Sequence, residues 1–327
     1  MLKNQRNKFF LDTKTTFINA AYMSPLLKAV EKIGMQGILK KRNPASISIA
    51  DFFETGEAIR KEFANLIRVK EPNRVVIIPS VSYGIASVVK NINLKPSQNI
   101  VMAEGQFPSN YYPWYRLVKE NGAKLNIVEA PKELNKRGKK WNERILDSIN
   151  RNTRVVALGH IHWADGTLWD LKKIRQRTRE VGALLIIDGT QSIGALPFSV
   201  QSFEPDAVIC AGYKWLMGPY SIGLAYYGEH FDGGKPIEEN WINRLHSENF
   251  AGLVNYQEEY HEGALRYEVG EHSNFILAPM LLKALEQVNE WKPKNIQEYC
   301  KSITARPVEI LKEAGYLIEE DRYRGHH

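Results

Sequence analysis

The chain is poor in cysteine and contains no long apolar run and no glycine-rich nucleotide motif. Its two cysteines, Cys210 and Cys300, give neither a disulfide framework nor a metal-ligand spacing. No apolar run approaches the ~20 residues of a membrane-spanning helix, and the N-terminus lacks the apolar centre of a secretory signal. No predicted strand is followed by G-x-G-x-x-G or a P-loop, which disfavours nucleotide binding. We expect a cytoplasmic protein without a metal site and without membrane contact.

The formal net charge of +7 raises the question of nucleic-acid binding. The lysines and arginines are scattered through helical patterns and mixed with glutamate, and the densest run covers residues 132–144. Such a run, next to a helical pattern, is typical of a solvated helix face or loop rather than of a track along a phosphate backbone. We therefore expect no nucleic acid among the partners of this chain.

Between residues 74 and 228, short apolar runs alternate with helical patterns. Turn residues bound each run, and runs of this length predict strands. Regular alternation is typical of a mostly parallel sheet that is covered by helices on both faces, an α/β fold. The seven predicted strands are RVVIIP (74–79), NIVMAE (99–104), KLNIVEA (124–130), TRVVALGH (153–160), ALLIID (183–188), AVICA (207–211) and SIGLAYYG (221–228).

The two flanks of this alternation predict other structure. Before it, residues 24–42 indicate a helix with Ser24 as N-cap and Pro25 at the first position. After it, the stretch from 235 to 275 shows no strand rhythm, and long irregular stretches are usually functional or form interfaces. Two helices follow, and Pro307 is expected to break or kink the second. The final segment, YLIEE, begins what looks like a further strand.

Five loops follow predicted strands, and in an open parallel sheet ligands bind at that edge. Asp188 ends one strand, and Lys214 lies just past the next. A buried acid opposite a lysine is costly unless each has a task. An aromatic, low-dielectric setting lowers the pKa of an amine and frees its lone pair for attack on an aldehyde. The loops are SVSYG (80–84), GQFPSN (105–110), IHWADGT (161–167), GTQSIG (189–194) and GYKWLMGP (212–219).

Several residues in these loops have two interpretations. The SVSYG turn is either an anion site at a helix N-terminus or a helix N-cap formed by Ser82. Phe107 either covers a flat heterocycle or belongs to the core. His160 and His162 flank a strand end, where a histidine is more often structural than an acid or base.

DGTQSIG (188–194) with AGYKWLMGP (211–219) resembles the core of the class V, fold-type I pyridoxal-phosphate enzymes. This group includes aminotransferases, cysteine desulfurases, selenocysteine lyases, kynureninases and isopenicillin-N-epimerase-like proteins. The resemblance extends from residue 18 to residue 275. It implies an N-terminal segment (1–20) that packs with the small domain, a large pyridoxal-phosphate-binding domain (21–250), and a small C-terminal α/β domain (251–327) that looks cut short.

The resemblance implies a set of residues that bind the cofactor. Lys214 would carry it as an internal aldimine and move the substrate α-proton, while Asp188 would keep the pyridine nitrogen protonated. Ser82, the amide of Val81 and the Tyr213 hydroxyl would bind the phosphate. Gln191 would hydrogen-bond the ring hydroxyl, and Phe107 would stack on the ring face. Trp163 belongs to a strand-end loop beside them. On the substrate side, Arg266 would clamp a carboxylate through bidentate hydrogen bonds, and Asn19 would reach the pocket.

The chain also departs from the family pattern. Desulfurases commonly have Ser-x-His-Lys, where this chain has Ala211-Gly212-Tyr213-Lys214. The Tyr-Lys pair resembles kynureninases. Desulfurases need a mobile cysteine late in the chain, whereas Cys300 lies in a helical pattern and no cysteine follows RGHH. The sequence therefore argues against a cysteine-dependent desulfurase.

We thus predict a pyridoxal-phosphate-dependent enzyme of the aminotransferase class V family that abstracts the α-proton of an amino acid, as a transferase or lyase. A kynureninase-like hydrolase and an epimerase remain open, because they share these steps. A non-catalytic ligand-binding protein on the same fold is the alternative from another class. The resemblance also implies a homodimer with sites near the subunit boundary, and we expect loop 241–260, with Asn249, to reach across it.

Overall fold

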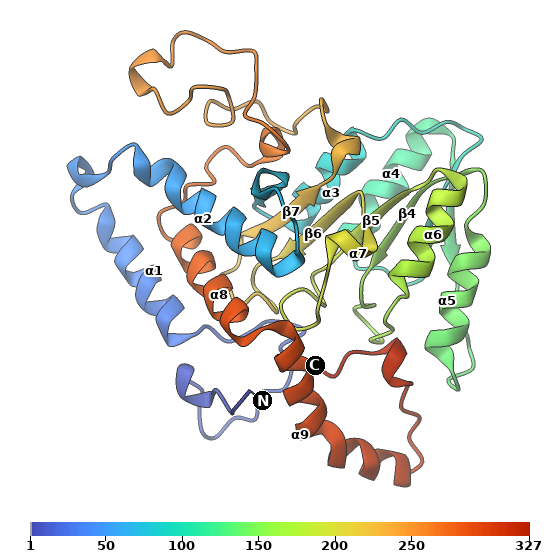
Figure 1. Ribbon diagram of the computed structural model, residues 1–327. Coiled ribbons are helices and arrows are strands. Elements are labelled where there is room, and N and C mark those ends of the chain that lie inside the picture. The colour runs from blue at the N-terminus through green and yellow to red at the C-terminus, as the bar shows by residue number, and fades with distance from the viewer. Residues whose placement is uncertain (1) are drawn as a thin grey trace.

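The computed structural model describes residues 2–327, and a seven-stranded sheet lies at its centre (Figure 1). The strand order is β1-β7-β6-β5-β4-β2-β3, and β7 is antiparallel to both of its neighbours, whereas β2 to β6 pair in parallel. The predicted mostly parallel α/β sheet is therefore confirmed. The strands are β1 (Val75–Ile78), β2 (Asn99–Ala103), β3 (Lys124–Val128), β4 (Thr153–Gly159), β5 (Leu184–Asp188), β6 (Ala207–Ala211) and β7 (Gly223–Tyr227).

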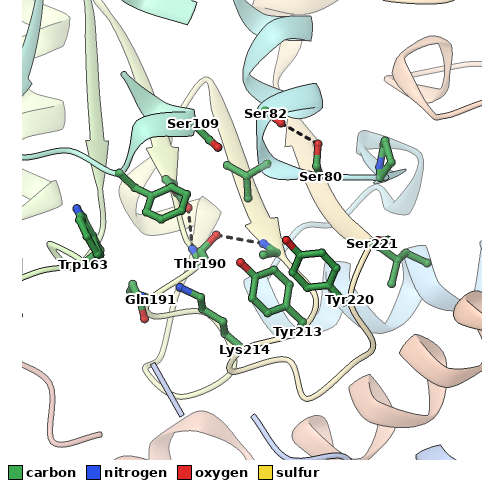
Figure 2. A pocket seen from close by; sticks show the side chains of 16 residues that line it. Ser80, Ser82, Ser109, Trp163, Thr190, Gln191, Tyr213, Lys214, Tyr220 and Ser221 are labelled. Atoms are coloured by element: carbon green, nitrogen blue, oxygen red, sulfur yellow. Dashed lines mark hydrogen bonds between the residues drawn. The ribbon is translucent and has the colours of Figure 1, made fainter. Parts of the chain in front are cut away.

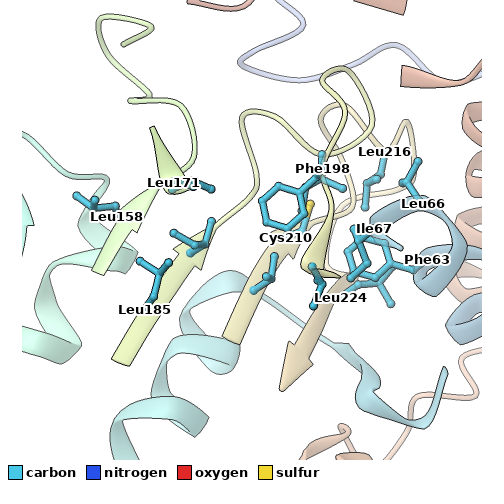
Figure 3. Packing of buried hydrophobic residues seen from close by; sticks show 14 of the residues in the cluster. Phe63, Leu66, Ile67, Leu158, Leu171, Leu185, Phe198, Cys210, Leu216 and Leu224 are labelled. Atoms are coloured by element: carbon cyan, nitrogen blue, oxygen red, sulfur yellow. The ribbon is translucent and has the colours of Figure 1, made fainter. Parts of the chain in front are cut away.

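Helices cover both faces of the sheet, which explains why most strands are apolar throughout rather than alternating. On one face, α2, α5, α6 and α8 form a large apolar cluster with the inward side chains of the strands (Figure 3). On the other face, α3 and α4 pack with the alternate side chains. The helices are α1 (Lys28–Lys40), α2 (Ala50–Ile67), α3 (Val81–Lys90), α4 (Tyr112–Asn121), α5 (Arg137–Ser148), α6 (Leu171–Val181), α7 (Val200–Phe203), α8 (Leu277–Trp291) and α9 (Pro293–Glu313).

Three local predictions are wrong. The first helix begins at Lys28 rather than beside Ser24, because the Ser24 amide donates to the carbonyl of Tyr213 (3.1 Å) and keeps this segment extended. The predicted break at Pro307 does not occur, because this residue lies inside one continuous α9; a kink there stays a prediction. The outer surface of α9 is largely exposed, so water can satisfy the carbonyl that proline leaves without a donor. Residues 316–320 form no strand and pair with none of the seven strands of the described chain.

The stretch between β7 and α8 is irregular, as predicted. Within residues 228–276, all of which the structure describes, only short 3-10 turns occur. Its central part projects from the body (orange in Figure 1) and is attached to α2 by a cluster of rings, in which Phe52 contacts Trp241, Phe250 and Phe275 edge to face. Among the described residues, no helix is both long and apolar enough to cross a bilayer.

Candidate active site

A cavity of about 280 Å³ lies at the carboxyl edge of the sheet, and all five predicted loops contribute to its wall (Figure 2). The sheet order explains this convergence, because β5 and β6 are adjacent and parallel and therefore end at the same edge. Eight of the ten predicted site residues line the cavity: Val81, Ser82, Phe107, Trp163, Asp188, Gln191, Tyr213 and Lys214.

Lys214 lies one tight turn beyond the end of β6. A Cβ on Gly212 would lie 2.5 Å from the carbonyl oxygen of Ile222, so only glycine permits the chain to turn here. The Lys214 side chain is buried, and its ammonium nitrogen lies 5.8 Å from the ring centroids of both Phe107 and Tyr213. Burial lowers the pKa of Lys214, and the charge of Asp188 opposes this effect. Burial therefore favours the neutral amine, which has an available lone pair.

Asp188 ends β5 and reaches the same cavity. Burial raises the pKa of its carboxyl, opposed first by hydrogen bonds from Thr190 and then by the charge of Lys214. The Thr190 amide donates to Asp188 Oδ1 (3.0 Å). The cavity therefore contains a carboxylate and an amine with no direct hydrogen bond between them among the described contacts, each free to bind another group.

Ser80 and Ser82 stand at the N-terminus of α3. The N-cap is Ser80, whose Oγ accepts from the amide of Tyr83 (3.2 Å), and not Ser82. The Ser82 hydroxyl instead lies 2.9 Å from the Ser80 hydroxyl and faces the cavity. Unpaired amides, hydroxyls and the helix dipole together attract an anion. The interpretation of Ser82 as the cap is thus wrong, and the anion site remains.

Two aromatic side chains form one side of the cavity. Phe107 is 37% exposed and lines the cavity, so it is no core residue. Its ring contacts Trp163 edge to face at 5.4 Å, and the Trp163 indole donates to the carbonyl of Gly105 (2.7 Å). Gln191, which also lines the cavity, donates to the carbonyl of Ala21 (3.1 Å) and so ties the N-terminal segment to the site.

Arg266 and Asn19 do not line the cavity. The Arg266 guanidinium donates to the carbonyl of Gly234 (3.3 Å) and lies 4.8 Å from the ring centroid of Tyr260. Asn19 is exposed, and its side chain accepts from the amide of Tyr22 within its own turn. Within this chain, the predicted substrate-side pair is therefore separate from the other eight residues.

Both histidines of the fourth strand end have structural roles. His160 is buried between Phe198 and Phe203, and burial lowers its pKa to about 3. His162 Nε2 hydrogen-bonds the carbonyl of Glu104 (3.0 Å) and so holds the second strand's loop in place. Neither lines the inner cavity.

The sequence prediction missed several lining residues, among them Thr190, Ser109, Tyr220 and Ser221. Thr190 could have been found from the sequence, because this hydroxyl residue lies between two predicted site residues, Asp188 and Gln191. Tyr220 had none, because its place depends on a ring contact with Tyr213 (4.6 Å between centroids) that only the folded loop creates. Neither cysteine lines the cavity: Cys210 is fully buried within β6, and burial raises the pKa of its thiol.

Comparison with known proteins gives a consistent result. Residues 41–319 match the family model "Aminotransferase class-V". The chain is 27% identical over 266 residues to the "Uncharacterized aminotransferase YcbU" of Bacillus subtilis, covering 81% of this chain and 67% of that protein. It is 29% identical over 174 residues to a "Probable cysteine desulfurase" of Methanothermobacter thermautotrophicus, covering 53% of this chain and 42% of that one. The match thus spans less than half of the desulfurase.

Two solved structures share the fold. A mutant of C-DES with glycine covalently linked to its PLP cofactor superposes with a TM-score of 0.80 at 20% identity, covering 91% of this chain and 77% of that one. The apo cysteine desulfurase of Thermococcus onnurineus gives a TM-score of 0.77 at 20% identity, with coverages of 98% and 80%.

Proposed function

The chain belongs to the class-V aminotransferase family of pyridoxal-phosphate-dependent enzymes, and we propose that it removes the α-proton of an amino acid held beside Lys214. The observation that carries this proposal is a single cavity that holds a buried amine, a carboxylate and a hydroxyl-bearing helix N-terminus. These three groups match the three reactive parts of the cofactor: its aldehyde, its ring nitrogen and its phosphate.

The donor set of the cavity fits the cofactor. The Ser82 hydroxyl, the Val81 amide and the Tyr213 hydroxyl are proposed to bind the phosphate at the start of α3. Asp188 would keep a proton on the ring nitrogen, and Phe107 would cover one ring face. Gln191 and Trp163 complete the wall of the cavity. Gln191 would hydrogen-bond the ring hydroxyl.

Besides binding the cofactor's aldehyde carbon, Lys214 is the proposed acid and base of the reaction. Bound pyridoxal phosphate supplies a positively charged conjugated ring that withdraws electrons from the α-carbon of an attached amino acid. The Lys214 amine takes the α-proton and returns a proton, which requires the neutral form that its lowered pKa favours. The rings of Phe107 and Tyr213 both lie beside the amine, each centroid 5.8 Å from its nitrogen, and limit the access of water to it.

Within this reaction class, we propose a sulfur-containing amino acid as the substrate. Relatives at 27–29% identity are named cysteine desulfurase. A structural neighbour is described as a cystine C-S lyase in complex with its reaction product, cysteine persulfide. Transamination is the second candidate, since YcbU is named an aminotransferase.

We further propose that the enzyme is a homodimer and that loop 241–260 reaches the partner's site. Two large hydrophobic side chains of this loop are exposed to solvent in the single chain, Val254 at 75% and Tyr256 at 91%, and such exposed side chains are typical of an interface. If the loop reaches the partner's site, Asn249 would contact that site, and Arg266 would bind substrate there. A sedimentation profile of a fully active monomer would contradict it.

The shared first step can be tested before the substrate is known. The holoenzyme is incubated in D₂O with L-cysteine, L-cystine, L-alanine and L-glutamate, and proton NMR follows the α-proton signals. We expect loss of the signal for at least one of them, and no loss with Lys214→Ala. Release of sulfide and pyruvate identifies a lyase, whereas a requirement for a 2-oxo acid identifies a transferase. A protein that binds the cofactor but exchanges no α-proton would be the non-catalytic alternative.

A further inference from the structure

Thr190 lies between the two strand ends that carry Asp188 and Lys214. Its backbone amide donates to Asp188 Oδ1 (3.0 Å), and its Oγ1 accepts from the amide of Ala211 (3.1 Å), the last residue of β6 (Figure 2). Ala211 and Lys214 lie on the same short segment, three positions apart. One side chain therefore links the acid of one strand to the backbone that presents the amine of the next.

The hydroxyl of Thr190 has only one proton to donate. Because the Ala211 amide occupies a lone pair of Oγ1, the hydroxyl proton remains for another acceptor, and the Asp188 carboxylate is the charged group already bound by the amide of the same residue. The residue is 8% exposed, so water contributes little to either bond. Thr190 thus binds Asp188 through its amide, and the proton of its hydroxyl is available to the same carboxylate.

We propose that Thr190 is a positioning residue that keeps Asp188 ionised and directed at the cofactor's ring nitrogen, in register with Lys214. The proposal rests on the proposed function, in which Asp188 faces that nitrogen. Charge considerations agree with the geometry. Burial raises the pKa of Asp188, and the hydrogen bond from the Thr190 side chain is the strongest opposing influence, ahead of the charge of Lys214. Without the hydroxyl, Asp188 would hold its own proton more readily.

The test compares Thr190→Val, which keeps the shape and loses the hydroxyl, with Thr190→Ser, which keeps the hydroxyl and loses a methyl group. Each holoenzyme is prepared with ¹⁵N-labelled pyridoxal phosphate, and the ¹⁵N chemical shift reports the protonation of the ring nitrogen. We expect Thr190→Val to move this shift towards that of neutral pyridine and to weaken cofactor binding about tenfold, as for loss of a hydrogen bond to a charged group. Thr190→Ser should stay within about twofold of the wild type.

A double-mutant cycle separates action through Asp188 from a structural effect. In the Asp188→Asn background, Thr190→Val should change the cofactor affinity by less than about twofold, because the charge it supports is gone. Equal losses in both backgrounds, or equal losses with Thr190→Ser and Thr190→Val, would overturn the proposal. If Thr190→Val does not fold, Thr190→Ala takes its place in the cycle. Failure of the proposed function itself would look different, since wild-type protein would then form no covalent link to the cofactor.

Discussion

Replacement of Ser82 by alanine should weaken cofactor binding without weakening the fold. Ser80 caps α3 through its Oγ, whereas the Ser82 hydroxyl faces the cavity and, among the residues that the structure describes, hydrogen-bonds only to Ser80. The two serines are two positions apart on one turn, yet only one of them supports the helix. Ser80→Ala is therefore the matched control for Ser82→Ala.

The magnitudes follow from these contacts. A hydrogen bond to a charged phosphate contributes about 1.5–3 kcal/mol, and about 1.4 kcal/mol is a factor of ten in Kd. Ser82→Ala should thus raise the Kd for pyridoxal phosphate about 10- to 150-fold. The free energy of unfolding of the apo-protein should change by less than about 0.5 kcal/mol, as for other surface substitutions. Ser80→Ala should lower it by about 1 kcal/mol, because the helix loses its cap.

The assay titrates each apo-variant with pyridoxal phosphate and with pyridoxal, which lacks the phosphate, and follows the quenching of tryptophan fluorescence. Urea unfolding of the same samples gives the stability. Ser82→Ala should affect pyridoxal phosphate alone. An equal loss for both ligands would refute the assignment of the phosphate to the start of α3. So would an unfolding free energy that falls with Ser82→Ala as much as with Ser80→Ala.

Three further predictions concern buried charge and are each checked by urea unfolding. Glu268→Gln should cost about 3–5 kcal/mol, because it leaves Arg60 buried without its charged partner (2.8 Å); a loss below about 1 kcal/mol would count against this. Apo Asp188→Asn should be more stable than the wild type at pH 7. Burial raises the pKa of the wild-type Asp188 carboxyl, so the folded state binds more protons than the unfolded state, and the stability of the wild type falls as pH rises above about 3.9. Equal stability at pH 7 would disprove it. His160, with its pKa lowered to about 3 by burial, favours the unfolded state as pH falls below about 6.5, and His160→Gln should flatten that slope.

The sheet was predictable from sequence because its strands are covered on both sides. A strand such as β5, Leu184–Asp188, shows a continuous apolar run that ends in a single acid, so both its extent and its functional end are visible. The adjacency of Asp188 and Lys214 followed from the rule that parallel strands end at one edge. The same rule brings the five strand-end loops to one edge, and eight of the ten residues that the family resemblance named line the cavity there.

The remaining details depend on contacts between distant segments. Ser24 resembles a helix cap in sequence, but its partner is the Tyr213 carbonyl, 189 residues away. Tyr220 joins the cavity wall only through the ring of Tyr213. The inclusion of Arg266 was suggested by the family pattern alone, and in this chain its guanidinium packs against Tyr260 instead. Local pattern does not encode such contacts.

The most direct test of the account is the covalent link to Lys214. Purified protein is incubated with pyridoxal phosphate, reduced with borohydride, digested and examined by peptide mass spectrometry, with Lys214→Ala and Lys214→Arg as controls. The account predicts a cofactor adduct on the peptide that contains Lys214, a visible absorbance band that disappears on reduction, and neither signal in the two variants. An adduct on another lysine, or a protein that stays colourless and unlabelled, would contradict it.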